Sequence, residues 1–362
     1  MEHLIDDVVN LSLQQLHRYA SERRTVRLDA WTMFFAYEVV SSLALGQTTG
    51  FLERGEDVNG IIESNHMGFW LNSNVGYLPG QSTWFANYYF LWFMTKLGSN
   101  FAAISDWIDG AVKDGRISQT NYTPRRSDLL QCFFEMTDMD GKPASDEEVA
   151  SEIGNVLGAG ADTTGTLIVA ALRYLIANPD DYRRVQQEVD NEHRESGLSN
   201  DQEIKYASLA KLPFLCAVIQ ESLRLHPSIV YQLPRESLTS ATMVGDYLIP
   251  PGVSISVSPT AANRSTEVFG LDANTWRPQR WIEKDESADS VPSQDSLMTF
   301  GRGSRGCLGK NLALVEAHKY IASFVRNFEA SFKDPEYQGK IKSFFFAKIE
   351  DVEVVLVSRR RQ

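Results

Sequence analysis

Apolar residues of this 362-residue chain recur mostly every three or four positions, which is the period of an amphipathic α-helix. Residues 4–16 show this spacing, and residues 28–45 form a second, more apolar stretch that ends at Gly46. Further stretches follow the same rule: the highly charged 180–194, then 214–225 and 312–328. The pattern therefore predicts a mainly helical protein.

The longest periodic segment spans residues 146–178. Ser145 and Glu148 form a capping-box signal at its start, and Asn178-Pro179 marks its end. Its middle, Ala159-Gly160-Ala161-Asp162-Thr163-Thr164, places glycine and polar groups where helix packing favours aliphatic side chains. A local rule broken inside a core helix often marks a functional site. The alternative is a threonine back-bond that bends the helix without chemistry.

Two segments alternate apolar and polar residues with the period of a strand. Residues 244–257 do so around Pro250-Pro251-Gly252, which predicts a hairpin-like turn, and residues 344–357 predict a strand pair. Residues 283–296 are rich in Asp, Glu, Ser and Pro and predict an exposed loop. We find no internal repeat and no linker, so we expect a single domain over 1–362, mainly α with small β-sheets.

Charge and cysteine content exclude several classes of protein. The 47 acidic and 35 basic residues give a net charge of −12, which argues against a nucleic-acid partner. The three widely spaced cysteines do not form a disulfide framework and suit a reducing compartment. No run of about 18 consecutive apolar residues occurs, so we expect no membrane-spanning segment, and the N-terminus has no signal-peptide pattern.

The run Phe300-Gly301-Arg302-Gly303-Ser304-Arg305-Gly306-Cys307-Leu308-Gly309-Lys310 surrounds one cysteine with glycines and precedes a predicted helix. Glycine permits positive φ and a close approach to a bulky group. A cysteine at a helix N-terminus ionises more easily, because the helix dipole favours the thiolate. The run therefore predicts a metal-binding thiolate. A buried structural cysteine is the alternative.

The order Phe-x-x-Gly-x-Arg-x-Cys-x-Gly resembles the haem-binding loop of the cytochrome P450 family. The resemblance implies that Cys307 is the thiolate axial ligand of haem b. It further implies that Phe300 packs near the sulfur, that Gly301 belongs to the turn, and that Arg305 pairs with a haem propionate. Arg235, in Leu233-Pro234-Arg235, matches a second propionate-binding arginine of the family. A solvated arginine would look the same in the sequence.

The resemblance extends to the long helix and to two later motifs. In the helix, Gly160 would leave room for O₂, and Asp162 and Thr163 would relay protons. Glu221-Ser222-Leu223-Arg224 resembles the Glu-x-x-Arg motif of the family, with Arg280 as its third member. Glu221, Arg224 and Arg280 would then form a structural triad rather than a catalytic one. Spacing alone would equally allow an ordinary surface ion pair.

The resemblance implies the fold of a cytochrome P450 and a monooxygenase that inserts one oxygen atom from O₂ into an apolar organic substrate. Electrons would come from NADPH through a separate reductase, because the chain has no dinucleotide-binding fingerprint. Basic residues near the cysteine would suit an acidic electron donor: Arg302, Arg305, Lys310, Lys319 and Arg326. The alternative for some of these side chains is that they face the haem or the interior. We also expect Val230, Tyr231 and Gln232 to line the substrate pocket. Residues 84–94, rich in aromatics, could touch a membrane surface, as expected on the cytoplasmic face of the endoplasmic reticulum; a core helix is the alternative.

Within the family, the chain is similar to fungal pisatin demethylase-like members, which implies secondary metabolism or detoxification. It departs from the family at its front: the anchor, the first β-region and the helices that roof the pocket have no counterpart, so we expect an N-terminally shortened member. Two other functions stay open. One is a fragment that binds haem poorly, and the other is an isomerase or dehydratase of the same fold.

Overall fold

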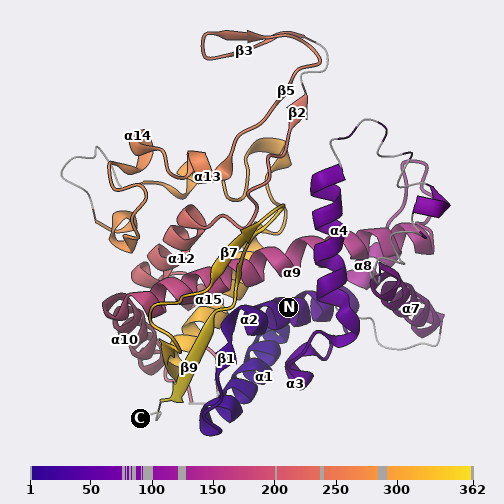
Figure 1. Cartoon of the computed structure of the whole chain (residues 1–362). Helices are drawn as coiled ribbons and strands as arrows, with labels where there is room; N and C mark the ends of the chain where they lie inside the picture. Colours follow the sequence, from indigo (N-terminus) through magenta and orange to yellow (C-terminus); the bar gives the residue numbers. More distant parts are fainter. Residues whose placement is uncertain are drawn as a thin grey trace.

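A computed structural model describes residues 2–75, 101–120, 128–199, 202–236, 240–283 and 292–359, together with 78, 80, 83, 87–90 and 92. Its helices are α1 (Glu2–Ser21), α2 (Leu28–Leu45), α3 (Phe51–Arg54), α4 (Ile61–Val75), α7 (Phe101–Thr120), α8 (Leu129–Phe134), α9 (Asp146–Ala177), α10 (Pro179–Glu195), α11 (Tyr206–Leu209), α12 (Pro213–Leu225), α13 (Pro259–Ala262), α14 (Thr266–Phe269) and α15 (Lys310–Asn327). Figure 1 shows α9 crossing the middle of the molecule.

The strands are short and peripheral. They are β1 (Val26–Arg27), β2 (Arg235–Glu236), β3 (Thr242–Val244), β4 (Tyr247–Ile249), β5 (Ser254–Ile255), β6 (Phe328–Phe332), β7 (Lys340–Ser343), β8 (Ala347–Glu350) and β9 (Glu353–Ser358). All pairs are antiparallel, in the order β1-β9-β6 with separate pairs β2-β5, β3-β4 and β7-β8. The expectation of a mainly helical fold with small sheets is therefore confirmed.

The capping box predicted at the start of α9 is present. The Glu148 amide donates to Ser145 Oγ at 3.2 Å, and the Ser145 amide donates to Glu148 Oε2 at 2.8 Å. At its other end, the chain turns at Asn178 and enters α10 through Pro179. Helix α2 ends, as predicted, at Gly46 in the left-handed conformation.

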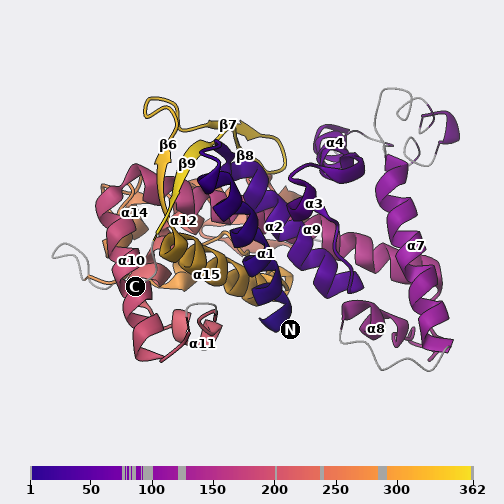
Figure 2. The ribbon, with the colours of Figure 1, turned by 90° about the horizontal axis from the view of Figure 1, so that it is seen from below.

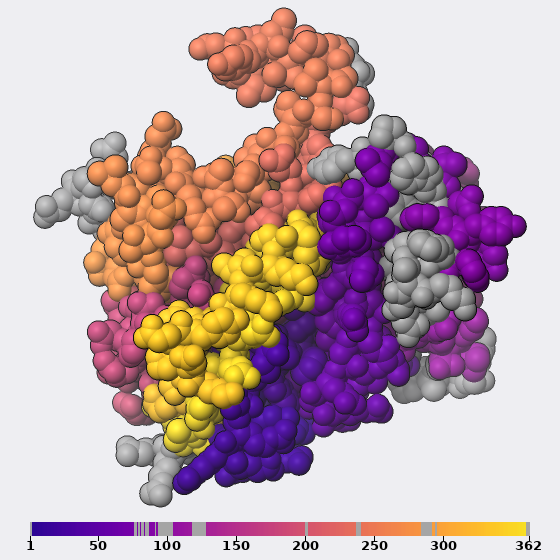
Figure 3. Space-filling view, in the orientation of Figure 1, coloured from indigo at the N-terminus to yellow at the C-terminus, as the bar shows by residue number. Residues whose placement is uncertain are grey.

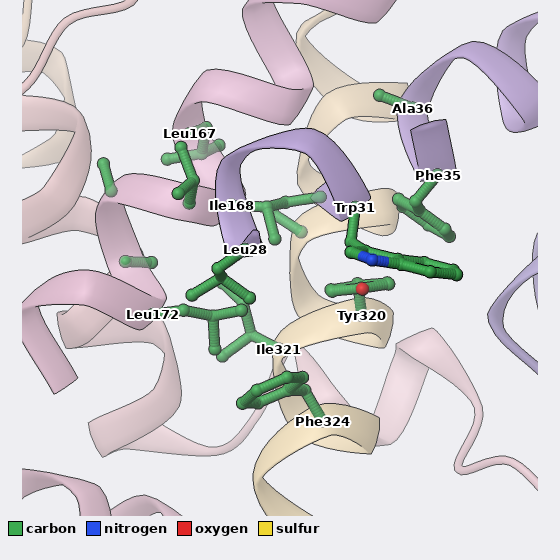
Figure 4. Packing of buried hydrophobic residues seen from close by; sticks show 14 of the residues in the cluster. Leu28, Trp31, Phe35, Ala36, Leu167, Ile168, Leu172, Tyr320, Ile321 and Phe324 are labelled. Atoms are coloured by element: carbon green, nitrogen blue, oxygen red, sulfur yellow. The ribbon is translucent and has the colours of Figure 1, made fainter. Parts of the chain in front are cut away.

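The main hydrophobic core lies where α2, α9 and α15 meet. Figure 4 shows its side chains: Leu28, Trp31, Phe35 and Ala36 from α2, Leu167, Ile168 and Leu172 from α9, and Tyr320, Ile321 and Phe324 from α15. Each is almost completely buried, and burial stabilises a large apolar side chain by about 1.5–3 kcal/mol. A second cluster joins α7 and α8 to the first half of α9. These two helices lie at the opposite end of the molecule from α10 (Figure 2).

Two turns differ from the sequence prediction. The hairpin β3-β4 turns at Gly245, where φ is 57°, and not at Pro250-Pro251-Gly252, which instead connects β4 to β5. The two prolines cannot donate ladder hydrogen bonds, so the chain leaves the hairpin there. The hairpin stands away from the body of the molecule (Figure 3).

The predicted strand pair within 344–357 is also wrong. Two strands form, but β8 pairs with β7 and β9 pairs with β1 and β6. Between them the backbone turns at Asp351, whose φ is 62°. Asp351 is held by ion pairs with Lys340, at 2.7 Å, and Arg27, at 3.1 Å. This turn sends β9 to a different sheet.

A buried lysine ties the first helix to α15. Lys319 is completely buried, and its ammonium pairs with Glu2 at 2.8 Å and with Asp6, while also donating to the Ile204 carbonyl at 3.1 Å. A buried ammonium needs such partners, because it is costly to remove from water. Of the two placements that the sequence left open for Lys319, a basic surface or the interior, the structure shows the interior.

Gly165 sets the distance between α2 and α9. A Cβ at this position would lie 3.1 Å from the Met33 Cα and 3.2 Å from the Thr32 carbonyl oxygen, both of which are backbone atoms. Because backbone cannot rotate away, Gly165→Leu should lower the free energy of unfolding by about 1–3 kcal/mol. Urea denaturation would measure this.

Gly110 in α7 provides the matched control, because a Cβ there has no heavy atom within 4 Å. Gly110→Leu should leave stability unchanged or raise it, since leucine favours the helix over glycine by roughly 0.5–1 kcal/mol. Equal losses in the two variants would contradict the close approach of α2 and α9.

Candidate functional site

The cysteine loop is held by two positive-φ glycines and two backbone hydrogen bonds. Gly301 and Gly303 have φ values of 65° and 66°, a region that residues with a Cβ rarely adopt. The Cys307 amide donates to the Phe300 carbonyl at 2.8 Å, and the Gly306 amide donates to the Gly303 carbonyl at 3.1 Å. The loop thus presents Cys307 just before the first turn of α15, with its side chain exposed.

A cavity of about 430 Å³ opens beside this cysteine. Its apolar wall consists of Leu223, Leu297, Phe300 and Leu314, and its cations are Arg302 and Lys310. The Lys310 ammonium lies 5.9 Å from the centre of the Phe300 ring. Arg305 is exposed on the same loop. Gln220 and Asp295 complete the lining, so the site combines one thiol with apolar, cationic, amide and acidic side chains.

This donor set fits a haem better than a bare metal ion. Among the described residues, no group of three His, Cys, Asp or Glu side chains could hold a metal. A single sulfur can complete a metal centre only if the metal brings its other ligands with it. The porphyrin of a haem does so, its apolar faces suit leucine and phenylalanine, and its carboxylates suit arginine and lysine.

Thr163 lies on the accessible side of α9. Its hydroxyl donates to the Ala159 carbonyl at 2.8 Å, and its own carbonyl accepts from the Ser228 hydroxyl at 2.8 Å. Ala159, one turn earlier, is exposed. The back-bond considered from the sequence is present, but it occupies only the hydroxyl hydrogen. The oxygen keeps lone pairs that can accept a hydrogen bond from outside the helix.

Asp162 faces the other way, into the protein. It is completely buried and accepts hydrogen bonds at Oδ2 from Asn65, at 2.6 Å, and Tyr37, at 3.1 Å. Its Oδ1 pairs with His66 Nε2. The acid and the alcohol are adjacent in sequence, yet their side chains belong to different surroundings.

Lys348 of β8 adds a largely buried cation to this cluster. Its Nζ lies 2.8 Å from His66 Nδ1, and burial lowers the pKa of Lys348. Burial and the nearby Asp162 carboxylate raise the pKa of Tyr37 well above 10, so its phenol stays a hydrogen-bond donor. The sequence analysis missed Tyr37, His66 and Lys348, because no motif links residues this far apart in the chain.

Gly160 has a packing role that is independent of any cofactor. A Cβ there would lie 2.8 Å from Val40 Cγ2 in α2. The side of Gly160 that a side chain would occupy therefore faces α2. Any contribution to an oxygen-binding space would come from its backbone.

The structure brings Glu221, Arg224 and Arg280 together. All three are buried. Arg224 donates to both Glu221 oxygens at 2.9 and 2.7 Å, and Arg280 Nε donates to Glu221 Oε1 at 3.1 Å. The Trp281 indole donates to Glu221 Oε2 at 2.9 Å, and Asp272 pairs with Arg280 at 3.1 Å. The sequence motif did not reveal these last two partners.

Arg224 also binds the backbone that precedes the cysteine loop. It donates to the carbonyls of Asn263 and Thr275, each at 3.1 Å, and to that of Ala273. The Asn263 side chain in turn donates to Thr299 Oγ1 at 2.8 Å and accepts from the Met298 amide at 2.8 Å. The ion-pair cluster therefore reaches to the residue before Phe300.

Arg235 lies on β2 and is exposed. Its guanidinium donates to the nearby carbonyls of Leu233 and Pro234 at 3.1 and 3.0 Å. No carboxylate pairs with it in the part of the chain that the structure describes. The group thus stays available for an anionic ligand.

Aromatic rings gather around one of the predicted pocket residues. Tyr231 and Phe345 have ring centres 5.2 Å apart, and Phe69 of α4 lies 5.0 Å from Phe345 and 4.7 Å from Phe346. The Val230 amide donates to the Phe345 carbonyl at 3.2 Å. The β7-β8 turn, α4 and the segment after α12 therefore share one aromatic cluster.

The aromatic segment 84–94 lies mostly outside the described residues, so its predicted membrane contact is not addressed by the structure. Of its described members, Tyr88, Tyr89 and Trp92 are exposed. Within the described parts of the chain, none of the helices combines the length and the apolar character needed to cross a membrane.

The buried triad supports a stability prediction. Arg224→Met would leave the Glu221 carboxylate buried without its closest partner, which typically costs about 3–5 kcal/mol. We expect a loss of that size in the free energy of unfolding, measured by urea denaturation. A variant that no longer shows a cooperative unfolding transition, because its native state is no longer stable, would also agree with this expectation.

Arg183 in α10 offers a matched control, since it pairs with Asp180 at the same spacing of three residues but in solvent. Arg183→Met should cost less than about 1 kcal/mol. A small effect in both variants would argue against a stabilising role for the triad.

Comparisons with known proteins show the family and the fold of this chain. A family model described as "Cytochrome P450" matches residues 1–350. Cytochrome P450 monooxygenase cicH from Emericella nidulans is 29% identical and matches 87% of this chain and 62% of its own length. Pisatin demethylase from Fusarium vanettenii is 25% identical, with 96% of this chain and 66% of its own length matched. The chain thus spans about two thirds of these relatives.

A shorter relative and a solved structure complete the picture. Cytochrome P450 monooxygenase ACRTS1 from Alternaria alternata is 29% identical, and the match covers 90% of this chain and 87% of that protein. The crystal structure of a cytochrome P450 (CYP102L1) superimposes with a TM-score of 0.79 over 98% of this chain and 73% of its own, at 21% identity. That similarity establishes the fold.

Proposed function

Since the chain belongs to the cytochrome P450 family, we propose that it is a haem-thiolate monooxygenase that inserts one oxygen atom from O₂ into an apolar organic substrate. The observation that carries this proposal is the exposed Cys307, held by its glycine loop beside a cavity that leucine, phenylalanine and cationic side chains help to line. Similarity to cytochrome P450 monooxygenases of fungi supports the same reaction class.

The proposed haem site uses residues from three parts of the chain. Cys307 would bind the haem iron, and Phe300, Gly301 and the backbone of Gly160 would be further residues of the cofactor site. Arg305 and Arg235 would pair with the propionates, because a guanidinium fork matches a carboxylate. A bound haem would supply the iron that activates O₂. The protein would then exclude water, orient the substrate and supply protons.

The proton-supplying residues would be Asp162 and Thr163. Thr163 keeps its oxygen lone pairs free for a hydrogen bond from outside α9, since its hydrogen is already donated to Ala159. Asp162 is the neighbouring ionisable group and is sealed from solvent. This acid-alcohol pair favours O₂ activation over rearrangement or dehydration on the same fold, which would not need it.

The substrate and the electron source are inferred from surfaces and relatives. The aromatic cluster around Phe69, Tyr231 and Phe345 suits a ring-containing apolar compound. Relatives such as pisatin demethylase favour secondary metabolism or detoxification.

Electrons would come from NADPH through a separate reductase. Arg302, exposed on the cysteine loop, would offer a cation to an acidic donor.

A haem-poor polypeptide is the second candidate. Leu308, directly after Cys307, is fully exposed, so the apolar surface next to the proposed ligand is open to water. A direct measurement of haem content after expression separates the two candidates. One haem per chain supports the monooxygenase, and a chain that is folded but free of haem supports the alternative.

The ligand assignment predicts a spectrum. The reduced, CO-bound protein should show a thiolate-type Soret band, and Cys307→Ala should abolish it because alanine cannot bind iron. Cys132 is also exposed, so Cys132→Ala is the matched control and should keep the band. A thiolate-type band that survives in Cys307→Ala would refute the assignment.

The proton-supply assignment predicts uncoupling. The Thr163→Ala protein should still consume NADPH. The amount of product formed per NADPH should fall roughly tenfold or more, because general acid catalysis typically contributes at least that factor. Parallel assays of reductant, peroxide and product would measure the ratio. Thr242→Ala, on the exposed strand β3, is the control. An unchanged ratio in Thr163→Ala would exclude the role.

A further inference from the structure

We propose that the His66 imidazole passes protons from the surface to Asp162. Lys348 holds the imidazole of His66 in the tautomer that this transfer needs. This inference deepens the proposed function, on which it rests. It concerns residues that lie outside the sequence motifs, on α4 and β8.

The hydrogen bonds run in one line. Lys348 Nζ lies 2.8 Å from His66 Nδ1, and His66 Nε2 bonds to Asp162 Oδ1. A lysine ammonium only donates, so Nδ1 must accept. The ring hydrogen therefore sits on Nε2 and points at the carboxylate. One nitrogen receives a proton from outside while the other delivers one inside, which is the arrangement of a histidine shuttle.

Exposure decreases from the outer members of the line to the inner one. The side chains of His66 and Lys348 are 18% and 13% exposed, whereas Asp162 is completely buried. Glu350, 23% exposed, lies 3.9 Å from the Lys348 ammonium at the outer end. Solvent therefore reaches Lys348 and His66 directly, and it reaches the Asp162 carboxylate through these two side chains.

The other groups around Asp162 mark which oxygen exchanges the proton. Tyr37 and Asn65 both donate to Oδ2. Asn65 carries no ionisable proton, and the raised pKa of Tyr37 keeps its phenol protonated. His66 alone faces Oδ1 among the described residues. The proton therefore enters at Oδ1, while Oδ2 stays fixed.

The transfer balances as a single proton. The Nε2 hydrogen moves to Asp162 Oδ1, and Lys348 gives a proton to Nδ1. Burial lowers the pKa of Lys348 and so makes this donation easier than from an ordinary lysine. Solvent then reprotonates Lys348. The net result is one proton on Asp162, and the partly exposed imidazole returns to its first tautomer by exchange with water.

Nitrogen NMR of the histidine side chains shows which ring nitrogen of His66 carries the hydrogen, and it needs no cofactor. The chain has six histidines, and His66→Gln identifies the signal of interest by its loss. We expect His66 to be neutral with its hydrogen on Nε2. Lys348→Met should shift the Nδ1 resonance and reduce this tautomer preference, whereas Lys211→Met, at an exposed position after α11, should not.

The orientation is overturned if His66 carries its hydrogen on Nδ1, or if Lys348→Met changes nothing. Both results are independent of haem binding. A chain that takes up no haem would therefore refute the proposed function, while these spectra would still decide the arrangement of Lys348, His66 and Asp162.

A second experiment tests delivery in the haem-loaded protein. Glutamine at position 66 can still donate to Asp162 but cannot pass a proton on. We expect His66→Gln to lower product formed per reductant by about tenfold or more, with a larger solvent isotope effect and partial rescue by added imidazole. His3→Gln, on the exposed side of α1, should match the unchanged protein. Normal coupling and isotope effect in His66→Gln would overturn the proposal.

Discussion

The close approach of α2 and α9 is the constraint on which the rest of the structure depends. Gly160 and Gly165 allow it, since a side chain at either position would meet Val40 or the backbone around Met33. At this distance Tyr37 of α2 reaches Asp162 of α9, and the aromatic residues of α2 close the core against α15. The same interface thus packs the core and holds Asp162. A change that separates α2 from α9 would lower stability and also break the hydrogen bond from Tyr37 to Asp162.

Two adjacent residues of α9 show how a helix can place one side chain in the core and the next one on an accessible side. Successive side chains of an α-helix point about 100° apart, so Asp162 and Thr163 can be neighbours along the chain and still face different surroundings. The acid is fixed by donors from α2 and α4, while the alcohol faces the accessible side. The backbone between them keeps the two groups a constant short distance apart.

Sequence analysis predicted the features that are encoded locally. The capping box at Ser145, the end of α2 at Gly46 and the cysteine loop each depend on residues close together in the chain. Pairings between distant segments could not be predicted this way: β8 and β9 choose other partners because the backbone reverses at Asp351. The same limit hid His66 and Lys348, whose relation to Asp162 exists only after α4 and β8 have packed beside α9. The sequence could not decide whether Lys319 faces the surface or the interior, because the residues that neutralise it lie at the far end of the chain.

The ion pairs of Lys319 with Glu2 and Asp6 give the first turn of α1 an importance beyond its length. An ammonium with no exposed surface cannot recover hydration when its counterions are removed, so shortening the chain by only a few residues would strand a charge inside α15. The beginning of α1 therefore acts as a counterion for the helix that carries the cysteine loop. Any change to α1 therefore has to preserve two carboxylates rather than a stretch of backbone.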